Sequence, residues 1–497
     1  MISARRCSSF SASTAIVTVI RPVNTVRTPS AKIVYASGSG IVKITYPSEQ
    51  WINVSPAADP DENVRTTSSQ PIMFSPVNKH ELLAAFQFVE SSTNGGVTWK
   101  KISPDLTYPK GESPPPEHAP AAASGAARVP PNRSAIESMS ASSVSAGTIW
   151  VGTNNGLIKV TRDHGATWQD ASIADLPNRA RADISSVDAS HQDAATAYVA
   201  VDYHSIGDYT PYLYRTHDYG KTWTKIVNGM RTDQPSGSFA RVVRSDPERR
   251  GLLFAGTESS VYVSFDDGDN WQSLMLNLPN TSYRDITFHG NDLVVGTYGR
   301  GIWILDDYAV LRQVTPELAS QPAHLFKPDE TIRYRRNVNA DTPFPPEVPH
   351  ALNPPDGVVI YYSLASKPSS PISIDVLDAS GALVRHMSSV AEPPVKEAAV
   401  PPEPNFWLAP PFALPAEAGT NRTNWDLRYD APPALSHSYE INANPGLTPA
   451  SPEGPMAMPG VYTIRLTVDG KSSTQTVTVK NDPRSPATLA DVRAQHD

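Results

Sequence analysis

One short pattern occurs four times in this chain, and it limits the possible fold more than any other feature. Its form is Ser/Thr-x-Asp/Asn-x-Gly-x-Thr/Asn-Trp. From average residue usage, a chance match should arise at a frequency of about 10⁻⁵ per position, so four matches in one register are not accidental. The fixed positions of these four octets are Ser92, Asn94, Gly96 and Trp99; Thr161, Asp163, Gly165 and Trp168; Thr216, Asp218, Gly220 and Trp223; and Ser264, Asp266, Gly268 and Trp271.

Each octet has the chemistry of a hairpin turn. An Asp or Asn side chain accepts hydrogen bonds from backbone N–H groups of its own turn. The glycine adopts a backbone conformation that costs other residues more, and the tryptophan begins the next strand with an indole that can be buried. We therefore predict a structural role for all four octets, in preference to direct ligand binding or catalysis.

The octets recur at intervals that approach about 50 residues, the size of one four-stranded propeller blade. Short β-branched runs bounded by Gly and Asn precede them, as expected of strands. We predict an all-β chain with a β-propeller over residues 31–311, interrupted by a Pro/Ala-rich insertion at 109–131. The count is about six blades with incomplete terminal ones, and the ring is either open or closed. In the first blade, Trp51 stands where an octet tryptophan would be.

The C-terminal part predicts a second all-β domain. A Pro-rich linker at 312–356 precedes alternating strands over 357–482, and Asp469-Gly470 is a two-residue hairpin signal. The alternation predicts a β-sandwich of immunoglobulin or fibronectin type. It carries a Pro-rich insertion at 391–417, and a C-terminal tail follows at 483–497.

Composition excludes several classes of protein. The net charge of -8 gives no basic surface for nucleic acid. Cys7 is the single cysteine, so neither an internal disulfide nor a cysteine-based metal site can form. No run of residues approaches the ~20 apolar residues of a transmembrane helix. Residues 1–30 are predicted to be a disordered leader, and they lack a convincing signal peptide.

The sequence contains no recognisable catalytic pair. A glycosidase needs two carboxyl groups on either side of the scissile bond, but the spacing of the acidic residues outside the octets selects no pair. His164, His217 and His289 show no metal-ligand spacing, and we predict neither a metal nor a cofactor. Aromatic side chains in the loop 202–211 could line a sugar- or peptide-binding face. The acidic candidates on blade loops are Glu90, Asp105, Asp202, Asp208, Glu258 and Asp285.

The octets resemble the Asp-box, or bacterial neuraminidase repeat, of sialidases, xyloglucanases and sortilins. Residues 296–307, 102–107 and 423–429 are similar to segments of the large bacterial sortilin-like proteins that are often labelled glycosyl hydrolase. This resemblance covers roughly residues 31–485. It implies a secreted or periplasmic protein and a chain truncated at both ends. Arg21-Pro22 does not match the Arg-Ile-Pro motif of sialidases.

Two functions follow from this interpretation. The first is a propeller that binds a peptide, protein or glycan ligand through its loops. The alternative is a glycoside hydrolase, xyloglucanase-like or sialidase-like, whose active site the sequence does not identify. The Asp-box itself does not decide between them, because enzymes and non-enzymes share it. A damaged or truncated homologue without independent function is the third option.

Overall fold

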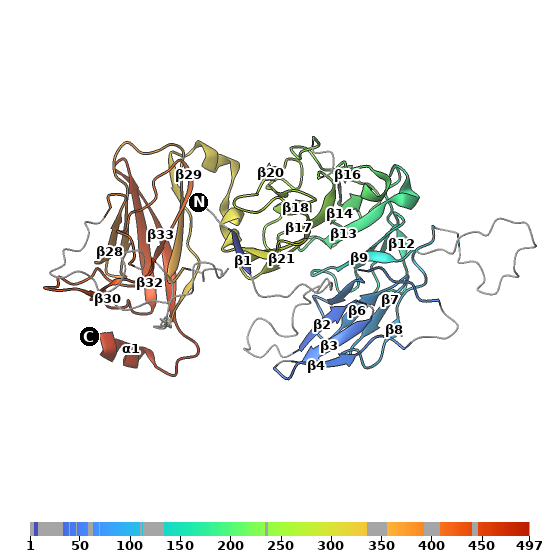
Figure 1. The fold of residues 1–497 in the computed structure, drawn as a ribbon, viewed down its shortest axis with the longest axis horizontal. Helices are drawn as coiled ribbons and strands as arrows, with labels where there is room; N and C mark the ends of the chain where they lie inside the picture. Colours follow the sequence, from blue (N-terminus) through green and yellow to red (C-terminus); the bar gives the residue numbers. More distant parts are fainter. Residues whose placement is uncertain are drawn as a thin grey trace, which may run out of the picture. The chain divides into compact units, whose positions relative to one another are not determined.

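The structure is a computed structural model of the chain. The chain forms two compact units, one spanning Ser9–Ile304 and the other combining Met1–Ser8 with Leu305–Asp497. Figure 1 shows both units, which consist mainly of strands. The structure describes residues 4–7, 33–38, 40–45, 47–57, 63–68, 70–109, 112, 134–233, 237–334, 355–391, 408–439 and 446–496.

The Ser9–Ile304 unit is a succession of small antiparallel sheets, an architecture consistent with a β-propeller, and we call it the propeller unit. Within the described residues, five sheets follow one another in sequence order, and β23, β22 and β21 are neighbours in a sixth. The strands are β2 (Ile33–Ser37), β3 (Ile41–Thr45) and β4 (Gln50–Asn53); β5 (Ile72–Phe74), β6 (Leu82–Ala85), β7 (Val89–Ser92) and β8 (Lys100–Lys101); β9 (Ile136–Ala141), β10 (Ile149–Thr153), β11 (Ile158–Thr161) and β12 (Gln169–Asp170); β13 (Asp183–Ala189), β14 (Ala197–Asp202), β15 (Tyr212–Thr216) and β16 (Thr224–Lys225); β17 (Ala240–Ser245), β18 (Leu253–Thr257), β19 (Val261–Ser264) and β20 (Gln272–Ser273); and β21 (Tyr283–His289), β22 (Asp292–Thr297) and β23 (Ile302–Leu305). Strand β1 (Ala4–Cys7) belongs to the other unit.

The first strands of neighbouring sheets lie against one another. Strand β9 contacts β13, β13 contacts β17, and β17 contacts β21. We call these four the inner strands. Apolar clusters fill the space between successive sheets; one of them joins Trp150 and Ile158 to Ile184 and Val199. The short 3-10 helices η1 (Arg179–Arg181) and η2 (His204–Ile206) lie in the loops before and after the β13-β14 pair.

The Leu305–Asp497 part is a sandwich of two sheets, and we call it the sandwich unit. The sheets have the orders β24-β26-β29 and β25-β33-β32-β27-β28, and their facing side chains share one core that includes Trp425 and Ile464. The elements are η3 (Tyr308–Gln313), η4 (Pro316–Ser320), β24 (Ala323–Leu325), β25 (Thr331–Arg333), β26 (Val358–Leu364), β27 (Ser373–Leu377), β28 (Leu383–Ser388), β29 (Gly419–Trp425), β30 (Ser438–Tyr439), β31 (Ala450–Ser451), β32 (Gly460–Val468), β33 (Lys471–Asn481) and α1 (Leu489–His496).

The predicted linker at 312–356 differs from the structure in its first half. Strand β24 pairs with β26 and strand β25 pairs with β33, so residues 323–333 are part of the sandwich rather than a connection to it. Sequence analysis does not predict these strands, because each is only three residues long and stands in a Pro-rich segment. In the predicted leader 1–30, the one described element is β1. Most of the insertions 109–131 and 391–417 lies outside the described residues.

Trp51 has the position that the octet comparison predicts: it stands three residues before Val54, which accepts the Trp99 indole N–H, just as Trp99 stands three residues before Ile102, which accepts that of Trp168. Its surroundings differ from those of the octet tryptophans. It lies within β4, and its surface is 67% exposed. The octet tryptophans instead precede the fourth strand of their sheets and are half-buried or buried. Among the described residues the first sheet has three strands, and β4 corresponds to the fourth strand of the later sheets, although the sequence before Trp51 lacks the octet pattern.

Candidate functional site

The four octets occupy the same place in four sheets, between the third strand and the fourth. In each, the Ser/Thr hydroxyl accepts a hydrogen bond from the glycine N–H at 2.9 to 3.0 Å and donates one to the Asp/Asn side chain at 2.8 to 3.0 Å. The same carboxyl or amide oxygen accepts the N–H of the residue before the tryptophan. The Ser/Thr and Asp/Asn side chains at the fixed positions of an octet thus bond within their own turn.

Each octet is also fastened to the sheet before it. The indole N–H of its tryptophan donates to a backbone carbonyl of the preceding sheet at 2.8 to 3.1 Å. The glycine approaches the same place, since a Cβ on Gly165 would lie 2.1 Å from the Ile102 carbonyl oxygen. The tryptophan–acceptor pairs are Trp99 with Val54, Trp168 with Ile102, Trp223 with Ala171, and Trp271 with Ile226.

Among the six acidic candidates, the structure brings Asp202 and Glu258 together. Arg241 bonds to both, through Nη1 to Asp202 Oδ2 at 2.6 Å and through Nη2 to Glu258 Oε2 at 2.9 Å. The other four have separate surroundings: Glu90 pairs in register with Lys101, Asp105 bonds to Arg65, Asp208 accepts the Tyr212 hydroxyl, and Asp285 bonds to Arg244.

Three inner strands have a β-bulge at the same point. The bulged residues are Glu137 in β9, Arg241 in β17 and Arg284 in β21, and each follows a residue that pairs with a threonine of the second strand. A bulge leaves one residue unpaired and re-aims its side chain, which is why bulges often occur beside functional sites. The threonines are Thr153, Thr257 and Thr297.

The register of β13 shifts at the same point, between Asp183 and Ser186, but its sheet differs from the other three in the residues that pair there. Its second strand carries Asp202 where the other sheets have threonine, and Asp202 pairs in register with Asp183. Asp202 is 1% exposed and is held by Arg241 and by the backbone N–H and Nδ1 of His204, at 2.8 and 2.7 Å from Oδ1. Two carboxylates therefore face each other across a strand pair, a juxtaposition that is unfavourable when both are charged.

Glu137, Asp183 and Asp202 form a group that we call the acidic centre. Burial raises the pKa of Glu137 to about 7, and the charge of Asp202 acts in the same direction. Burial also raises the pKa of Asp183 well above its ordinary value, with further contributions from Glu137 and Asp202, while Arg241 opposes the change. Among the described residues, the buried Oδ1 of Asp183 has no hydrogen-bond partner.

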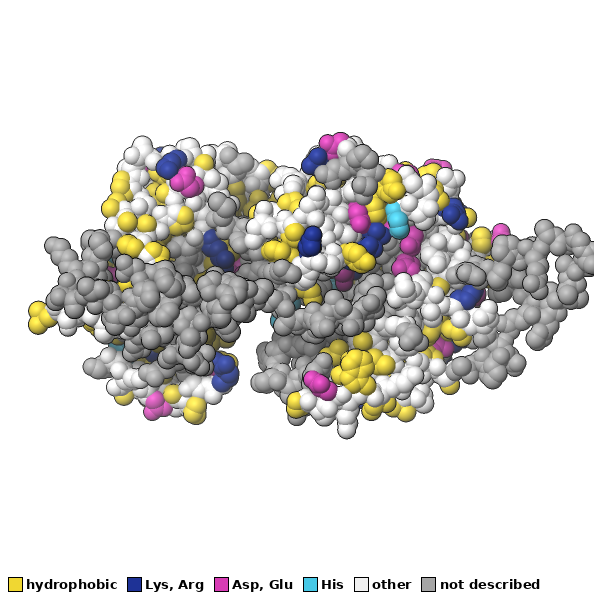
Figure 2. All heavy atoms as spheres, in the orientation of Figure 1, with side chains coloured by type: hydrophobic (Ala, Val, Ile, Leu, Met, Phe, Trp, Pro, Cys, Tyr) yellow, Lys and Arg dark blue, Asp and Glu magenta, His cyan; other side chains and the backbone are white. Residues whose placement is uncertain are grey.

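Aromatic side chains surround the loops that follow the second strands. Phe239 packs between the guanidinium of Arg241, at 4.3 Å, and the ring of His204, at 5.2 Å. Tyr209, 38% exposed, contacts Phe239 at 5.9 Å. Tyr298 is 71% exposed, and Arg284 lies 5.1 Å from its ring. Figure 2 shows a histidine beside acidic, basic and hydrophobic side chains on the visible face of the propeller unit.

Sequence analysis missed Glu137, Asp183 and Arg241 as members of a site. Each stands in a strand rather than in a loop, and each comes from a different sheet. The available signal was the end of the second strand, where Gly-Thr recurs at 152–153, 256–257 and 296–297 but is replaced by Val201-Asp202. The loop 202–211, for which the sequence allows either a binding face or an ordinary loop, contains His204 and Tyr209, whereas its Tyr203 is buried.

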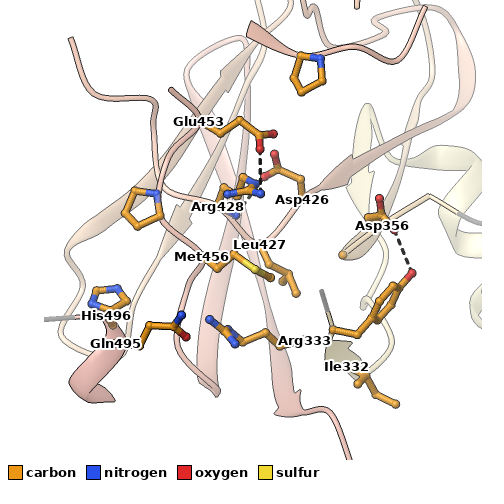
Figure 3. Close-up of a pocket in the computed structure, with 14 residues that line it drawn as sticks. Ile332, Arg333, Asp356, Asp426, Leu427, Arg428, Glu453, Met456, Gln495 and His496 are labelled. Carbon is orange, nitrogen blue, oxygen red and sulfur yellow. Dashed lines mark hydrogen bonds and ion pairs between the residues drawn. The ribbon is translucent and has the colours of Figure 1, made fainter. Parts of the chain in front are cut away.

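The sandwich unit contains a cavity of about 460 Å³. Figure 3 shows two pairs among its polar side chains. Arg428 bonds to Glu453 at 2.9 Å, and the Tyr334 hydroxyl donates to Asp356 at 3.0 Å. These two pairs take up part of the polar lining, and they do not select a ligand of one particular class.

Within the part of the chain that the structure describes, no three His, Cys, Asp or Glu side chains are arranged to hold a metal ion. The described helices include none with the length and apolar character needed to cross a membrane.

No protein-family profile matches the chain, and no curated protein matches it. One similar solved structure is YCF48 bound to D1 peptide, with 18% identity over 32% of this chain and 47% of that chain and a TM-score of 0.25. An ancestral GH74 enzyme has 13% identity, covers 96% of this chain and 48% of its own, and has a TM-score of 0.39. A GH74 xyloglucanase from Xanthomonas campestris has 14% identity, coverages of 92% and 87%, and a TM-score of 0.38. The chain spans about half the length of the first two, and similarities this weak assign no activity.

Proposed function

We propose that the propeller unit is a ligand-binding module and that its ligand contacts the loops after the second strands, above the acidic centre. The observation that carries this proposal is the buried Oδ1 of Asp183, which has no partner among the described residues. Buried polar atoms are nearly always hydrogen-bonded in native proteins, so an exception needs an explanation, and a bound ligand supplies one.

Exposed aromatic side chains on the same loops support the proposal. Tyr209 and Tyr298 offer an apolar ring and a hydroxyl, the combination that is enriched in binding surfaces. Peptides, proteins and glycans can all use such a surface. We further propose that the sandwich unit is a spacer or docking module with an Ig-like fold, and that the protein is secreted or periplasmic, as the Asp-box resemblance implies.

Glycoside hydrolysis is the second candidate, and one observation favours it. A carboxyl whose pKa is about 7, such as Glu137, resembles the general acid of a glycosidase. The partner carboxylate is the weak point. Asp202 is almost fully buried, and its oxygens are bound by Arg241 and His204, so it is poorly placed to attack a sugar or to activate water.

A binding and hydrolysis screen on the full chain tests both candidates. We expect binding to a peptide or glycan without turnover, and at least about tenfold weaker binding in the double variant Tyr209→Ala/Tyr298→Ala, which corresponds to 1.4 kcal/mol. The matched control is Trp51→Ala, an exposed aromatic in the same unit but outside these loops. If the Tyr209/Tyr298 double variant binds the ligand as tightly as Trp51→Ala, these loops are not the binding face. Xyloglucan hydrolysis that Glu137→Gln abolishes would establish the enzyme instead.

A further inference from the structure

The acidic centre contains more carboxyl groups than its arginines can neutralise. Arg241 already bonds to Asp202 and Glu258. Arg284 lies over Tyr298, near Arg241, Glu258 and Asp202. Glu137 and Asp183 therefore share a buried region in which no described arginine bonds to either of them.

The other charged groups that face this region are also engaged. The imidazole of His204 bonds to Asp202 and stacks on Phe239. Glu258 accepts a second hydrogen bond, from the Ser282 hydroxyl at 2.7 Å. What the centre still offers is a buried carboxylate acceptor, Asp183 Oδ1.

The chemistry of that acceptor selects among ligands. A carboxylate accepts hydrogen bonds only, and an ammonium or guanidinium group only donates them. A sugar hydroxyl needs acceptors and donors together, whereas Arg241 already bonds through Nε and Nη2 to Glu258 and through Nη1 to Asp202. Hydrogen bonds between a cation and a carboxylate are about twice as strong as neutral ones.

We infer that the acidic centre is a subsite for a cationic side chain, an arginine or lysine of a peptide, which bonds to Asp183 and Glu137. The inference rests on the proposed ligand-binding function and names its ligand class. The exposed rings of Tyr209 and Tyr298 would contact the aliphatic stem or the backbone of the peptide. Because Glu137 holds its proton up to a pH of about 7 in the free protein, cation binding releases protons and strengthens as the pH rises.

Matched peptides on the full chain test the inference. The probes are three fluorescent, end-blocked heptapeptides with a central arginine, lysine or citrulline, the last being the uncharged analogue of arginine. We expect the arginine peptide to bind at least about tenfold more tightly than the citrulline peptide, because the uncharged citrulline cannot form a charge-assisted hydrogen bond. Its affinity should rise roughly tenfold between pH 5.5 and pH 8.0, as expected when binding displaces about one proton.

Two variants and one control distinguish loss of the subsite from loss of the folded structure. Asp183→Asn and Glu137→Gln should each weaken arginine-peptide binding by about tenfold or more and flatten its pH dependence. Asp175→Asn, which removes an exposed carboxylate elsewhere in the same unit, should change neither. Circular dichroism and hydrogen exchange confirm that each variant is folded, and Glu137→Gln serves if Asp183→Asn does not fold.

The outcomes distinguish this inference from the function on which it rests. If citrulline and arginine peptides bind equally, or a neutral glycan binds with an affinity that Glu137→Gln leaves intact, the cationic subsite is wrong and the binding face survives. If no peptide or glycan binds, even at about 1 mM, where the free energy of binding is only about 4 kcal/mol, both proposals are wrong.

Discussion

The octets and the inner strands of the propeller unit differ in how far their polar groups are hydrogen-bonded. In the octets, hydroxyls and carboxyls are paired within a few residues of chain, and each indole N–H has a carbonyl partner in the preceding sheet. At the inner strands, Asp183 faces Asp202 and keeps one buried oxygen without a described partner. Satisfied groups stabilise a fold, whereas an unsatisfied buried group costs free energy.

The difference teaches where to look for function in a repeat protein. The octets repeat because every sheet needs the same connection to its neighbour. The acidic centre consists of departures from the repeat, such as the replacement of a Gly-Thr strand end by Val201-Asp202. Native proteins tolerate local violations of this kind mainly at functional sites, so the departures are more informative than the repeat.

The largest effect should come from breaking an octet at its tryptophan. Trp271 is 3% exposed, and its indole N–H donates to the Ile226 carbonyl at 2.9 Å. We expect Trp271→Ala to lower the free energy of unfolding of the propeller unit by about 3 to 5 kcal/mol, the range for a buried aromatic. Amide hydrogen exchange in β17–β20 measures this loss within the propeller unit alone.

Trp51→Ala is the matched control, since the same residue type is exposed there. Its effect should stay within about 0.5 kcal/mol, as for most surface substitutions. Equal losses in the two variants would mean that the octet indole contributes no more than any other tryptophan, and the contrast between turn and surface would disappear.

The turns could be predicted from sequence because their chemistry is local. The side chains of Thr161, Asp163 and Thr167 find their partners within the same octet. The acidic centre could not be predicted in the same way. Glu137, Asp183 and Arg241 are far apart in the chain, and only the register of three sheets, each with a register shift at this point, brings them together.

The six acidic candidates show the same limit. The sequence predicts all six on loops, but Glu90, Asp202 and Asp285 lie in strands. Glu137 and Asp183 are also in strands, and no local pattern distinguishes them from other strand acids. In the C-terminal half, the long strands were predicted from alternation. The three-residue strands β24 and β25 were not, because a short strand in a Pro-rich segment carries too little pattern.

An intermediate effect should come from neutralising the acidic centre. The pKa of Glu137 is raised from 4.5 to about 7 by burial. Between these values the unfolded chain loses the proton and the folded chain keeps it, so the free energy of unfolding falls as the pH rises from about 4.5 to about 7. Glu137→Gln removes this loss. We expect the difference in the free energy of unfolding, variant minus wild type, to be about 1 to 3 kcal/mol larger at pH 8 than at pH 4.5.

Urea denaturation of the wild-type chain and the variant at several pH values measures this difference. Asp175→Asn, in an exposed position, should leave the wild-type pH dependence unchanged. If Glu137→Gln follows the wild-type curve, the acidic centre is no more strained than the octets, and the comparison between the two regions fails.

The smallest effect should come from replacing an octet carboxylate by an amide. The hydroxyl and N–H of Thr167 and the hydroxyl of Thr161 bond to Asp163 and lower its pKa to about 2. The stability that these bonds give is present above the ordinary pKa and is lost as the pH falls toward about 2.

Asn94 shows that an amide can fill the same position. Its Oδ1 accepts the Thr98 N–H at 3.0 Å, and its Nδ2 donates to the Thr98 hydroxyl at 2.8 Å. Asp163→Asn should therefore leave the unfolding midpoint at pH 7 nearly unchanged and reduce the loss of stability between pH 4 and pH 2. Urea denaturation at pH 7 and pH 3 gives both quantities. A large loss at pH 7 would show that this turn depends on its negative charge, and the geometry shared by all four octets would then not be enough to explain why they recur.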